Sequence, residues 1–325
     1  MRIHVLNMLL PLPLLVMMAC ASAALAPPSE KALNLLLADE YQASIQEADR
    51  VLSSDPGDSE TLNVKARAVS ALGDDRQAIR LMSQALAAAE RNGQVSLSQQ
   101  ATYWSNLGYF HERLGNFETA LSQHQKALDM RIAVLGNDDL HTADSYNNLG
   151  TTLSKLGQYD QAIDNLEKNL AIRKRRLGEH DASVATALNN LGFAYHLQHR
   201  YQDALGYYQL ALDIDLANHG ANHPSVAIRW NNIGDAYFGL AQYDKAEAFL
   251  NKALSSDIAF FGERHPKVSL RYYNLGKIHE ARGDTGKARS TYTQALQIAR
   301  QFYPEDNWQI RHLQEKLQGL GKQAN

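Results

Sequence analysis

Cysteine is nearly absent from this sequence, because Cys20 is the only one among 325 residues. A disulfide needs two cysteines, so no bridge within the chain can stabilise the fold, which must rely on packing. Beyond position 20 the chain has no thiol that could serve as a catalytic nucleophile. The scarcity of cysteine therefore excludes both a disulfide scaffold and thiol chemistry in the main part of the chain.

An excess of charge of either sign is also missing. The sequence has 32 Lys and Arg against 35 Asp and Glu, which gives a formal net charge of −3. Proteins that bind nucleic acid through its phosphates carry a basic field, so no nucleic-acid partner is expected. The His-Glu-x-x-His pattern and a glycine-rich phosphate loop are both lacking. We therefore expect no enzyme, no metal and no cofactor.

Only one stretch is strongly apolar, residues 5–19, and it follows Arg2 near the N-terminus. A positive start, a short apolar run and an exit of small residues make up a secretory signal. The run is too short for a membrane helix, and Pro11 and Pro13 interrupt it. We predict a signal peptide and short tether over residues 1–26, and we expect an exported mature chain.

Cys20 ends the segment Val16-Met17-Met18-Ala19-Cys20, which resembles the lipobox of bacterial lipoproteins. The resemblance implies that Cys20 receives a diacylglyceryl group and becomes the new N-terminus. The next residue is Ala21 rather than aspartate, which by the same resemblance favours the outer membrane and a periplasmic location. The alternative is ordinary signal cleavage after Ala21-Ser22-Ala23, with Cys20 removed.

The rest of the chain repeats itself every 42 residues. This spacing separates the glycines Gly108, Gly150, Gly192, Gly234 and Gly276, the alanines Ala120, Ala162, Ala204, Ala246 and Ala288, and the leucines Leu128, Leu170, Leu212, Leu254 and Leu296. Internal repeats of this period are typical of stacked helical hairpins. The spacing therefore predicts an array of similar units.

Each unit has the pattern of two helices. In one unit, residues 104, 107, 108 and 111 fall on one helical face, and residues 120, 124, 127 and 128 fall on another. Gly115 lies between them, where glycine ends a helix in the left-handed conformation. His199 and Ala241 take that place in two units, where we expect less ideal turns. A glycine inside the first helix, facing a small alanine, predicts close backbone approach.

These motifs resemble the tetratricopeptide repeat family, on Trp230, Ile233, Gly234, Tyr237, Ala246 and Leu250. The 42-residue period and Gly220, His223-Pro224, Val226, Asn231 and Asn232 look like the kinesin light chain subgroup. The resemblance implies an all-α, right-handed solenoid of antiparallel helix pairs. We predict repeats at 27–58, 59–92, 101–134, 143–176, 185–218, 227–260 and 269–302, and a capping helix and tail at 303–325.

Asparagines recur on the first helices, in the places three and two before the helix glycine. They are Asn147, Asn189 and Asn231 in the first place, and Asn106, Asn148, Asn190, Asn232 and Asn274 in the second. Asparagine is a mediocre helix former, so its recurrence indicates a role. The resemblance implies that such amides hold an extended peptide in the concave groove. The alternative is that they tie neighbouring repeats together. Both interpretations stay open for the asparagines in the second place, whereas ligand contact is favoured for those in the first place.

Aromatic side chains lie further along the same face. Tyr109, Phe193 and Phe238 could form side-chain pockets beside the asparagines. The sequence thus indicates a non-enzymatic adaptor that binds an extended segment of another protein. Two alternatives remain: an envelope assembly factor that uses its convex face or ends, and a peptide-sensing regulatory domain.

Overall fold

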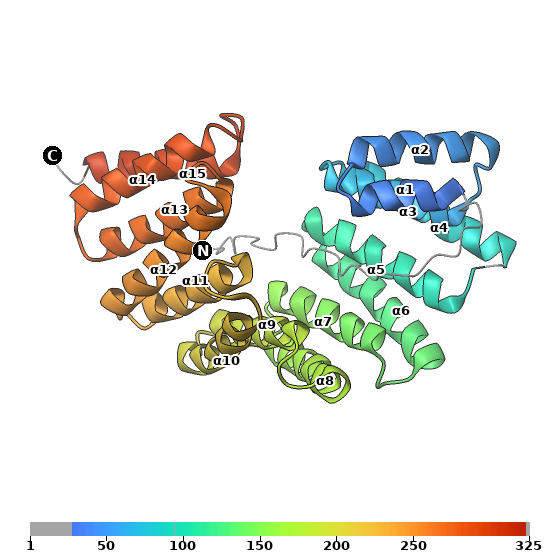
Figure 1. Cartoon of the computed structure of the whole chain (residues 1–325), viewed down its shortest axis with the longest axis horizontal. Coiled ribbons are helices and arrows are strands. Elements are labelled where there is room, and N and C mark those ends of the chain that lie inside the picture. Colours follow the sequence, from blue (N-terminus) through green and yellow to red (C-terminus); the bar gives the residue numbers. More distant parts are fainter. Residues whose placement is uncertain (1–27, 94, 323–325) are drawn as a thin grey trace. The chain divides into compact units, whose positions relative to one another are not determined.

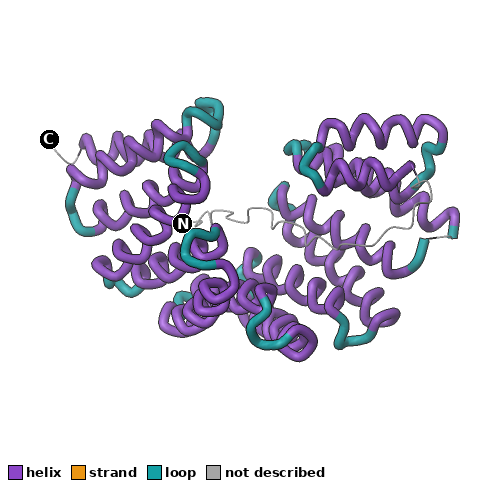
Figure 2. Tube along the Cα trace, viewed as in Figure 1, coloured by secondary structure: helices purple, strands orange, loops and turns teal. Residues whose placement is uncertain are grey.

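The computed structural model describes residues 28–93 and 95–322, so the segment 1–26 and Cys20 lie outside the described residues. Within the described ranges the chain forms fifteen helices and no strand (Figures 1 and 2). The helices are α1 (Pro28–Leu37), α2 (Tyr41–Ser54), α3 (Ser59–Ala71), α4 (Asp75–Asn92), α5 (Leu97–Arg113), α6 (Phe117–Leu135), α7 (Leu140–Lys155), α8 (Tyr159–Leu177), α9 (Ala182–Leu197), α10 (Tyr201–His219), α11 (Pro224–Gly239), α12 (Tyr243–Phe261), α13 (Pro266–Ala281), α14 (Thr285–Ala299) and α15 (Trp308–Lys322). The all-helical fold class is confirmed. Of the described helices, none is both long and apolar enough to cross a membrane.

From α1 to α7, and again from α9 to α15, each helix packs on the one that follows it in the chain. The chain divides into two compact units, unit 1 up to Ile172 and unit 2 from Arg173 onward. In unit 1 the first helix α5 contacts both α3 and α7, and in unit 2 the first helix α11 contacts both α9 and α13 (Figure 1). We call the surface that these first helices form in each unit its first-helix face.

The helix glycines allow the close contact that their spacing predicts. A Cβ built on Gly192 would lie 2.8 Å from the ring of Tyr208 and 3.2 Å from the backbone oxygen of Ala204. Tyr208 is 1% exposed and Ala204 is fully buried, so neither has room to retreat. The glycine therefore has a packing role between the two helices of a pair.

The turns without glycine are strained, as expected from the sequence. His199 has a φ of 60° and Ala241 a φ of 56°, in the left-handed region that side chains other than glycine seldom adopt. Gly115 takes the same place with a φ of 78°. The turn geometry is thus kept even where the residue is unfavourable.

Buried ion pairs join successive helix pairs in unit 2. Arg229 Nε of α11 lies 2.9 Å from Asp215 Oδ2 of α10, and Arg271 Nε of α13 lies 2.8 Å from Asp257 Oδ2 of α12. Each of the four side chains is at most 6% exposed. The two pairs are 42 residues apart, so the repeat carries the same link across two junctions.

The first helices begin at side-chain caps that lie upstream of the expected repeat starts. Asp139 and Asp181 cap α7 and α9 through carboxylates that accept a backbone N–H, and His223 and His265 cap α11 and α13 through their rings. Such caps satisfy N–H groups that lack a partner inside the helix. Helix α9, for example, therefore begins at Ala182.

The last helix covers the open end of the array. Ile310 and Leu313 of α15 are fully buried and Leu320 is 1% exposed, in a cluster with Tyr292 and Ala295 of α14. A terminal repeat needs such a cover because its apolar face would otherwise meet water. The predicted capping helix is confirmed, and it continues to Lys322.

Candidate functional site

The asparagines of unit 1 form hydrogen bonds between neighbouring first helices. Asn106 Nδ2 on α5 donates to Asn63 Oδ1 on α3 at 2.9 Å, and Asn148 Nδ2 on α7 donates to Ser105 Oγ on α5 at 3.0 Å. In both cases the asparagine in the second place of one repeat donates a hydrogen bond to the side chain in the first place of the preceding repeat. The amides therefore tie repeats together in unit 1.

Unit 2 has the same bonds in the same register. Asn232 Nδ2 donates to Asn189 Oδ1 at 2.7 Å, and Asn274 Nδ2 donates to Asn231 Oδ1 at 2.8 Å. Asn231 Nδ2 in turn donates to Asp235 Oδ2 at 3.0 Å on its own helix. We call these inter-repeat bonds, with those of unit 1, the amide ladder.

Burial separates the predicted asparagines into two groups. Asn189, Asn231 and Asn274 are buried, with 9%, 2% and 2% of their surface exposed, and each takes part in an inter-repeat bond. The half-buried asparagines are Asn106, Asn147, Asn148, Asn190 and Asn232. In α9 and α11 the first place, favoured for ligand contact on sequence grounds, is thus more deeply buried than the second, whereas in α13 the second-place Asn274 is the buried one. Ligand contact by the half-buried members stays a prediction.

Aromatic residues of the first-helix face are partly exposed to solvent. Tyr109 on α5 and Phe193 on α9 occupy the same place in their repeats, and each is 38% exposed. Arg113 lies 5.9 Å from the centre of the Tyr109 ring, and His196 stacks on Phe193 with 6.3 Å between ring centres. Phe238 on α11 is half-buried. All three predicted aromatic residues therefore have some surface available.

Lys277 lies among the aromatic rings of unit 2. Its Nζ is 5.4 Å from the centre of the Phe238 ring and 5.8 Å from that of Tyr273. The same ammonium lies 3.6 Å from Asp235 Oδ1 on α11. A cation over ring faces is attracted by their negative charge, and the carboxylate neutralises it. The surface here is consequently aromatic with little net charge.

His196 lies beside this surface, and its environment favours the neutral form of the ring. Burial lowers the pKa of His196, and the charge of Asp235, which acts in the opposite direction, does not offset it. Its ring also meets the edge of Tyr201 at 5.1 Å. A neutral, stacked imidazole behaves as another aromatic ring, so it extends the apolar character of the Phe193 region.

Glu280 links α13 to α14 and α15. Its Oε2 accepts the Tyr292 hydroxyl at 2.7 Å and lies 3.0 Å from Lys316 Nζ on α15. Burial raises the pKa of Glu280, but these hydrogen bonds and the charge of Lys316 outweigh it and lower the pKa below its usual value. The carboxylate is therefore ionised and already paired.

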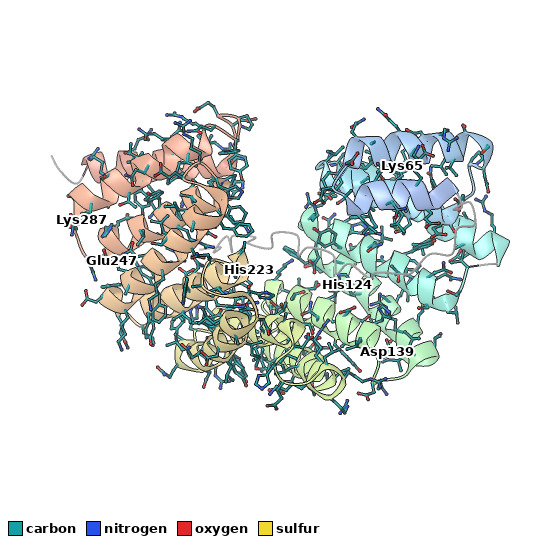
Figure 3. All side chains as sticks on the ribbon, viewed as in Figure 1. Lys65, His124, Asp139, His223, Glu247 and Lys287 are labelled. Carbon is teal, nitrogen blue, oxygen red and sulfur yellow. The ribbon has the colours of Figure 1, made fainter. Side chains whose placement is uncertain are left out.

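Glu112 makes a comparable cluster in unit 1. Lys155 Nζ of α7 lies 2.7 Å from Glu112 Oε2, the Thr152 hydroxyl donates to Oε1, and His124 Nε2 of α6 lies 3.7 Å from Oε1. Burial raises the pKa of Glu112, but His124 and Lys155 outweigh it and lower the pKa to about 2. Figure 3 labels His124 within this region. The cluster joins two repeats, and Glu112 and Lys155 are already paired within it.

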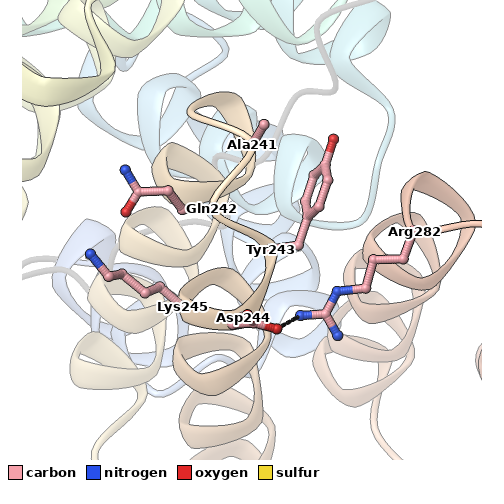
Figure 4. A pocket seen from close by; sticks show the side chains of 6 residues that line it. All are labelled: Ala241, Gln242, Tyr243, Asp244, Lys245 and Arg282. Atoms are coloured by element: carbon pink, nitrogen blue, oxygen red, sulfur yellow. Dashed lines mark hydrogen bonds and ion pairs between the residues drawn. The ribbon is translucent and has the colours of Figure 1, made fainter.

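A hollow lies at the turn between α11 and α12, lined by Ala241, Gln242, Tyr243, Asp244, Lys245 and Arg282 (Figure 4). Arg282 Nη1 lies 2.5 Å from Glu247 Oε2, and Nη2 pairs with Asp244. The Arg282 guanidinium is thus paired with two carboxylates of the protein. Over residues 28–93 and 95–322, no group of three or more His, Cys, Asp or Glu residues could hold a metal ion.

Comparisons with known proteins agree with this architecture. The tetratricopeptide repeat family matches residues 99–175, 183–259 and 230–301, and a second description of the same repeat matches residues 63–133. These matches cover more than half of the chain. No curated protein sequence matches it.

Solved structures share the fold. BtubC (BKLC) from P. vanneervenii has a TM-score of 0.58 at 24% identity, over 73% of this chain and 94% of that chain. A putative kinesin light chain from Podosopora anserina has a TM-score of 0.54 at 19% identity, over 63% and 96%. A tetratricopeptide repeat protein from Parabacteroides merdae has a TM-score of 0.64 at 14% identity, over 90% and 97%. The predicted likeness to kinesin-light-chain repeats is present at the level of fold.

Proposed function

The chain belongs to the tetratricopeptide repeat family, whose domains are generally scaffolds for protein–protein interaction, and from this premise we propose that it binds an extended segment of a partner protein on its first-helix faces. The observation that carries the proposal is the exposure of Tyr109 and Phe193, in the same place of two repeats, beside half-buried ladder asparagines. Large aromatic side chains that stay exposed beside polar groups are typical of protein-binding surfaces.

The amide ladder supports an extended ligand at a defined spacing. An amide nitrogen has two hydrogens, and Asn106, Asn148 and Asn232 each use one of them between repeats. Packed helices lie roughly 8–10 Å apart. An extended chain advances roughly 3.3 Å per residue. One amide is therefore available for about every third residue of the ligand, rather than for every peptide unit.

The charge of the first-helix face limits the kind of ligand. In unit 2 the charges cancel within each of the ion pairs Asp235–Lys277 and Glu280–Lys316. These residues therefore present no strong field of one sign. A ligand with a dense run of like charges would find little compensation there. We infer that the bound segment carries aromatic or aliphatic side chains at intervals, with its backbone polar groups facing the amides.

The double substitution Tyr109→Ala/Phe193→Ala tests this proposal. We expect it to weaken capture of a partner from envelope extract at least about tenfold, because exposed aromatic anchors contribute roughly 2 kcal/mol each in interfaces. Phe260→Ala is the matched control, since Phe260 is 55% exposed on the second helix α12. Equal capture by the double variant and the parent, with helicity unchanged, would remove the first-helix face as the binding surface.

A second function is an assembly factor that docks through its second helices. Leu210 on α10 and Phe260 on α12 are 52% and 55% exposed, which favours contact on that side. In this case the Phe260→Ala control would lose the partner, whereas the Tyr109/Phe193 variant would retain it. The same experiment therefore distinguishes the two functions.

We further propose that the chain works in the cell envelope, held at the outer membrane by a lipid on Cys20. The sequence of residues 1–26 supports this location, and these residues lie outside the described ones. Replacing Cys20 with serine is expected to move most of the protein from the membrane fraction to the soluble periplasmic fraction, because serine has no thiol to carry the lipid whose acyl chains would hold the protein to the bilayer. If the Cys20→Ser variant stays with the membrane to the same extent as the parent, the lipid anchor is excluded.

A further inference from the structure

The two histidines that begin α11 and α13 accept hydrogen bonds through a nitrogen that protonation would block. His223 Nδ1 accepts the backbone N–H of Ser225 at 3.2 Å, and His265 Nδ1 accepts the backbone N–H of Lys267 at 3.2 Å. A backbone N–H can only donate, so each imidazole must be neutral and carry its proton on Nε2. Both caps therefore exist only in the uncharged form of the ring.

Stacked rings fix the plane of each histidine. His219 stacks on His223 with ring centres 4.3 Å apart and 21° between planes, and Phe261 stacks on His265 at 4.1 Å and 10°. Phe260 also presents its edge to His223 at 6.2 Å. A ring held in this way cannot easily turn to offer another acceptor. Protonation of Nδ1 would then leave the helix start without its cap.

The groups around His223 disfavour a second positive charge. Burial lowers the pKa of His223, and nearby His219 and Lys267 lower it further, while Asp215 acts in the opposite direction. Asp215 is already paired with Arg229, which limits its support for an imidazolium. A positive ring would also meet the positive end of the helix dipole at the start of α11.

His265 has a matching environment at the start of α13. Burial lowers its pKa, Lys267 lowers it further, and Asp257 opposes both. Asp257 is paired with Arg271, and the Lys267 ammonium lies 4.6 Å from the centre of the Phe261 ring. Both histidines thus face a cation and a carboxylate that is already neutralised.

Helix α9 has the same start built from a carboxylate. Asp181 Oδ1 accepts the backbone N–H of Ser183 at 2.8 Å and its hydroxyl at 2.5 Å. His223 Nδ1 holds the N–H of Ser225 and contacts its hydroxyl at 2.8 Å in the same geometry. A carboxylate cap stays ionised well below the pH at which an imidazole takes up a proton. The chain therefore contains an acid-resistant and an acid-sensitive version of one cap, 42 residues apart.

We propose that His223 and His265 form an acid-sensitive switch, which releases the N-terminal turns of α11 and α13 together when the pH falls. Folded-state pKa values below the ordinary 6.5 mean that the folded chain binds fewer protons than the unfolded chain. The stabilisation from the caps is complete above about pH 6.5 and is lost as the pH falls through the lowered values. Helices α11 and α13 also carry Phe238 and Lys277, so the switch acts on the helices that build the first-helix face of unit 2.

Hydrogen exchange of the full chain, corrected for intrinsic rates, tests the switch at pH 7.5 and pH 5.0. The first turns of α11 and α13 are expected to open about fivefold more at the lower pH, as loss of one cap implies. The first turn of α9 is expected to show no such change. If α11 and α13 respond no more than α9, the switch is excluded.

Two variants exchange the caps. In His223→Asp/His265→Asp the acid response of α11 and α13 should disappear, and in Asp181→His the start of α9 should acquire it. A response that persists in the double aspartate variant would assign it to other groups and overturn the proposal. The Asp181→His variant keeps the test decisive if the double variant does not fold, as checked by circular dichroism.

Discussion

Replacing Arg271 with alanine is expected to lower the free energy of unfolding by about 3–5 kcal/mol, because it leaves a carboxylate buried without its partner. Asp257 is fully buried and its side chain lies 2.8 Å from Arg271 Nε. In a repeat protein, stability depends on the interfaces between neighbours, so the loss should appear at the junction of α12 and α13. Urea unfolding of the full chain and hydrogen exchange of these two helices measure it.

An exposed ion pair provides the matched control. Arg200 Nε lies 2.7 Å from Asp203 Oδ2, and the two side chains are 50% and 49% exposed. Arg200→Ala should cost at most about 0.5 kcal/mol, because water solvates each charge alone. Equal losses from Arg200→Ala and Arg271→Ala would show that burial does not determine the effect.

The chain itself contains an apolar version of the same junction. Ala299 and Leu313 stand 42 residues after Asp257 and Arg271, and both are fully buried. The double variant Asp257→Ala/Arg271→Leu should therefore recover most of the stability lost in Arg271→Ala, since buried ion pairs can be replaced by well-packed apolar residues. If the double variant is as unstable as the single one, the pair has a role that apolar packing cannot supply.

Replacing Gly276 with alanine is expected to destabilise the chain by about 2 kcal/mol, although alanine is the better helix former. A Cβ at this position would lie 2.4 Å from Cε1 of Tyr292. Tyr292 is fully buried and its hydroxyl donates to Glu280, so the ring cannot move aside without breaking that bond. Overpacking should therefore exceed the gain in helix propensity, as measured by urea unfolding.

Gly206 is the matched control for Gly276, because it is also a glycine inside a helix but has open space around it. It lies inside α10, and no atom beyond its own helix and chain neighbours lies within 4 Å of a Cβ built there. Gly206→Ala should stabilise the chain by about 1 kcal/mol through helix propensity alone. Substitutions of the same kind thus have opposite expected signs. Stabilisation by both would contradict the close packing at Gly276.

The fold could be predicted from the sequence because the residues of one packing contact recur in successive repeats. Gly192 with Ala204 and Gly276 with Ala288 preserve one helix–helix contact at a fixed spacing, which a single sequence reveals. The left-handed turns at His199 and Ala241 were predictable for the same reason, from the position of Gly115 in the repeat. Repetition makes local rules visible that a single copy would leave ambiguous.

The partners of the ladder asparagines could not be predicted in the same way. Spacing shows that Asn231 and Asn274 recur, but only the distance between helices decides that they bond to each other rather than to a ligand. Asn63 was missed as a ladder member because Ala66 stands where later repeats have the helix glycine, so the register was not marked there. The buried pair of Arg271 and Asp257 could not be predicted either, since burial depends on which helix face meets the next pair.

The measurement that tests the binding proposal most directly is site-specific photo-cross-linking of the full chain in envelope preparations. A photoreactive residue would replace Phe193 on the first-helix face and, in a second variant, Phe260 on α12. We predict a cross-linked partner from position 193, traced by mass spectrometry to one extended segment, and none from position 260. Cross-links from position 260 alone would contradict the proposal and assign binding to the second helices.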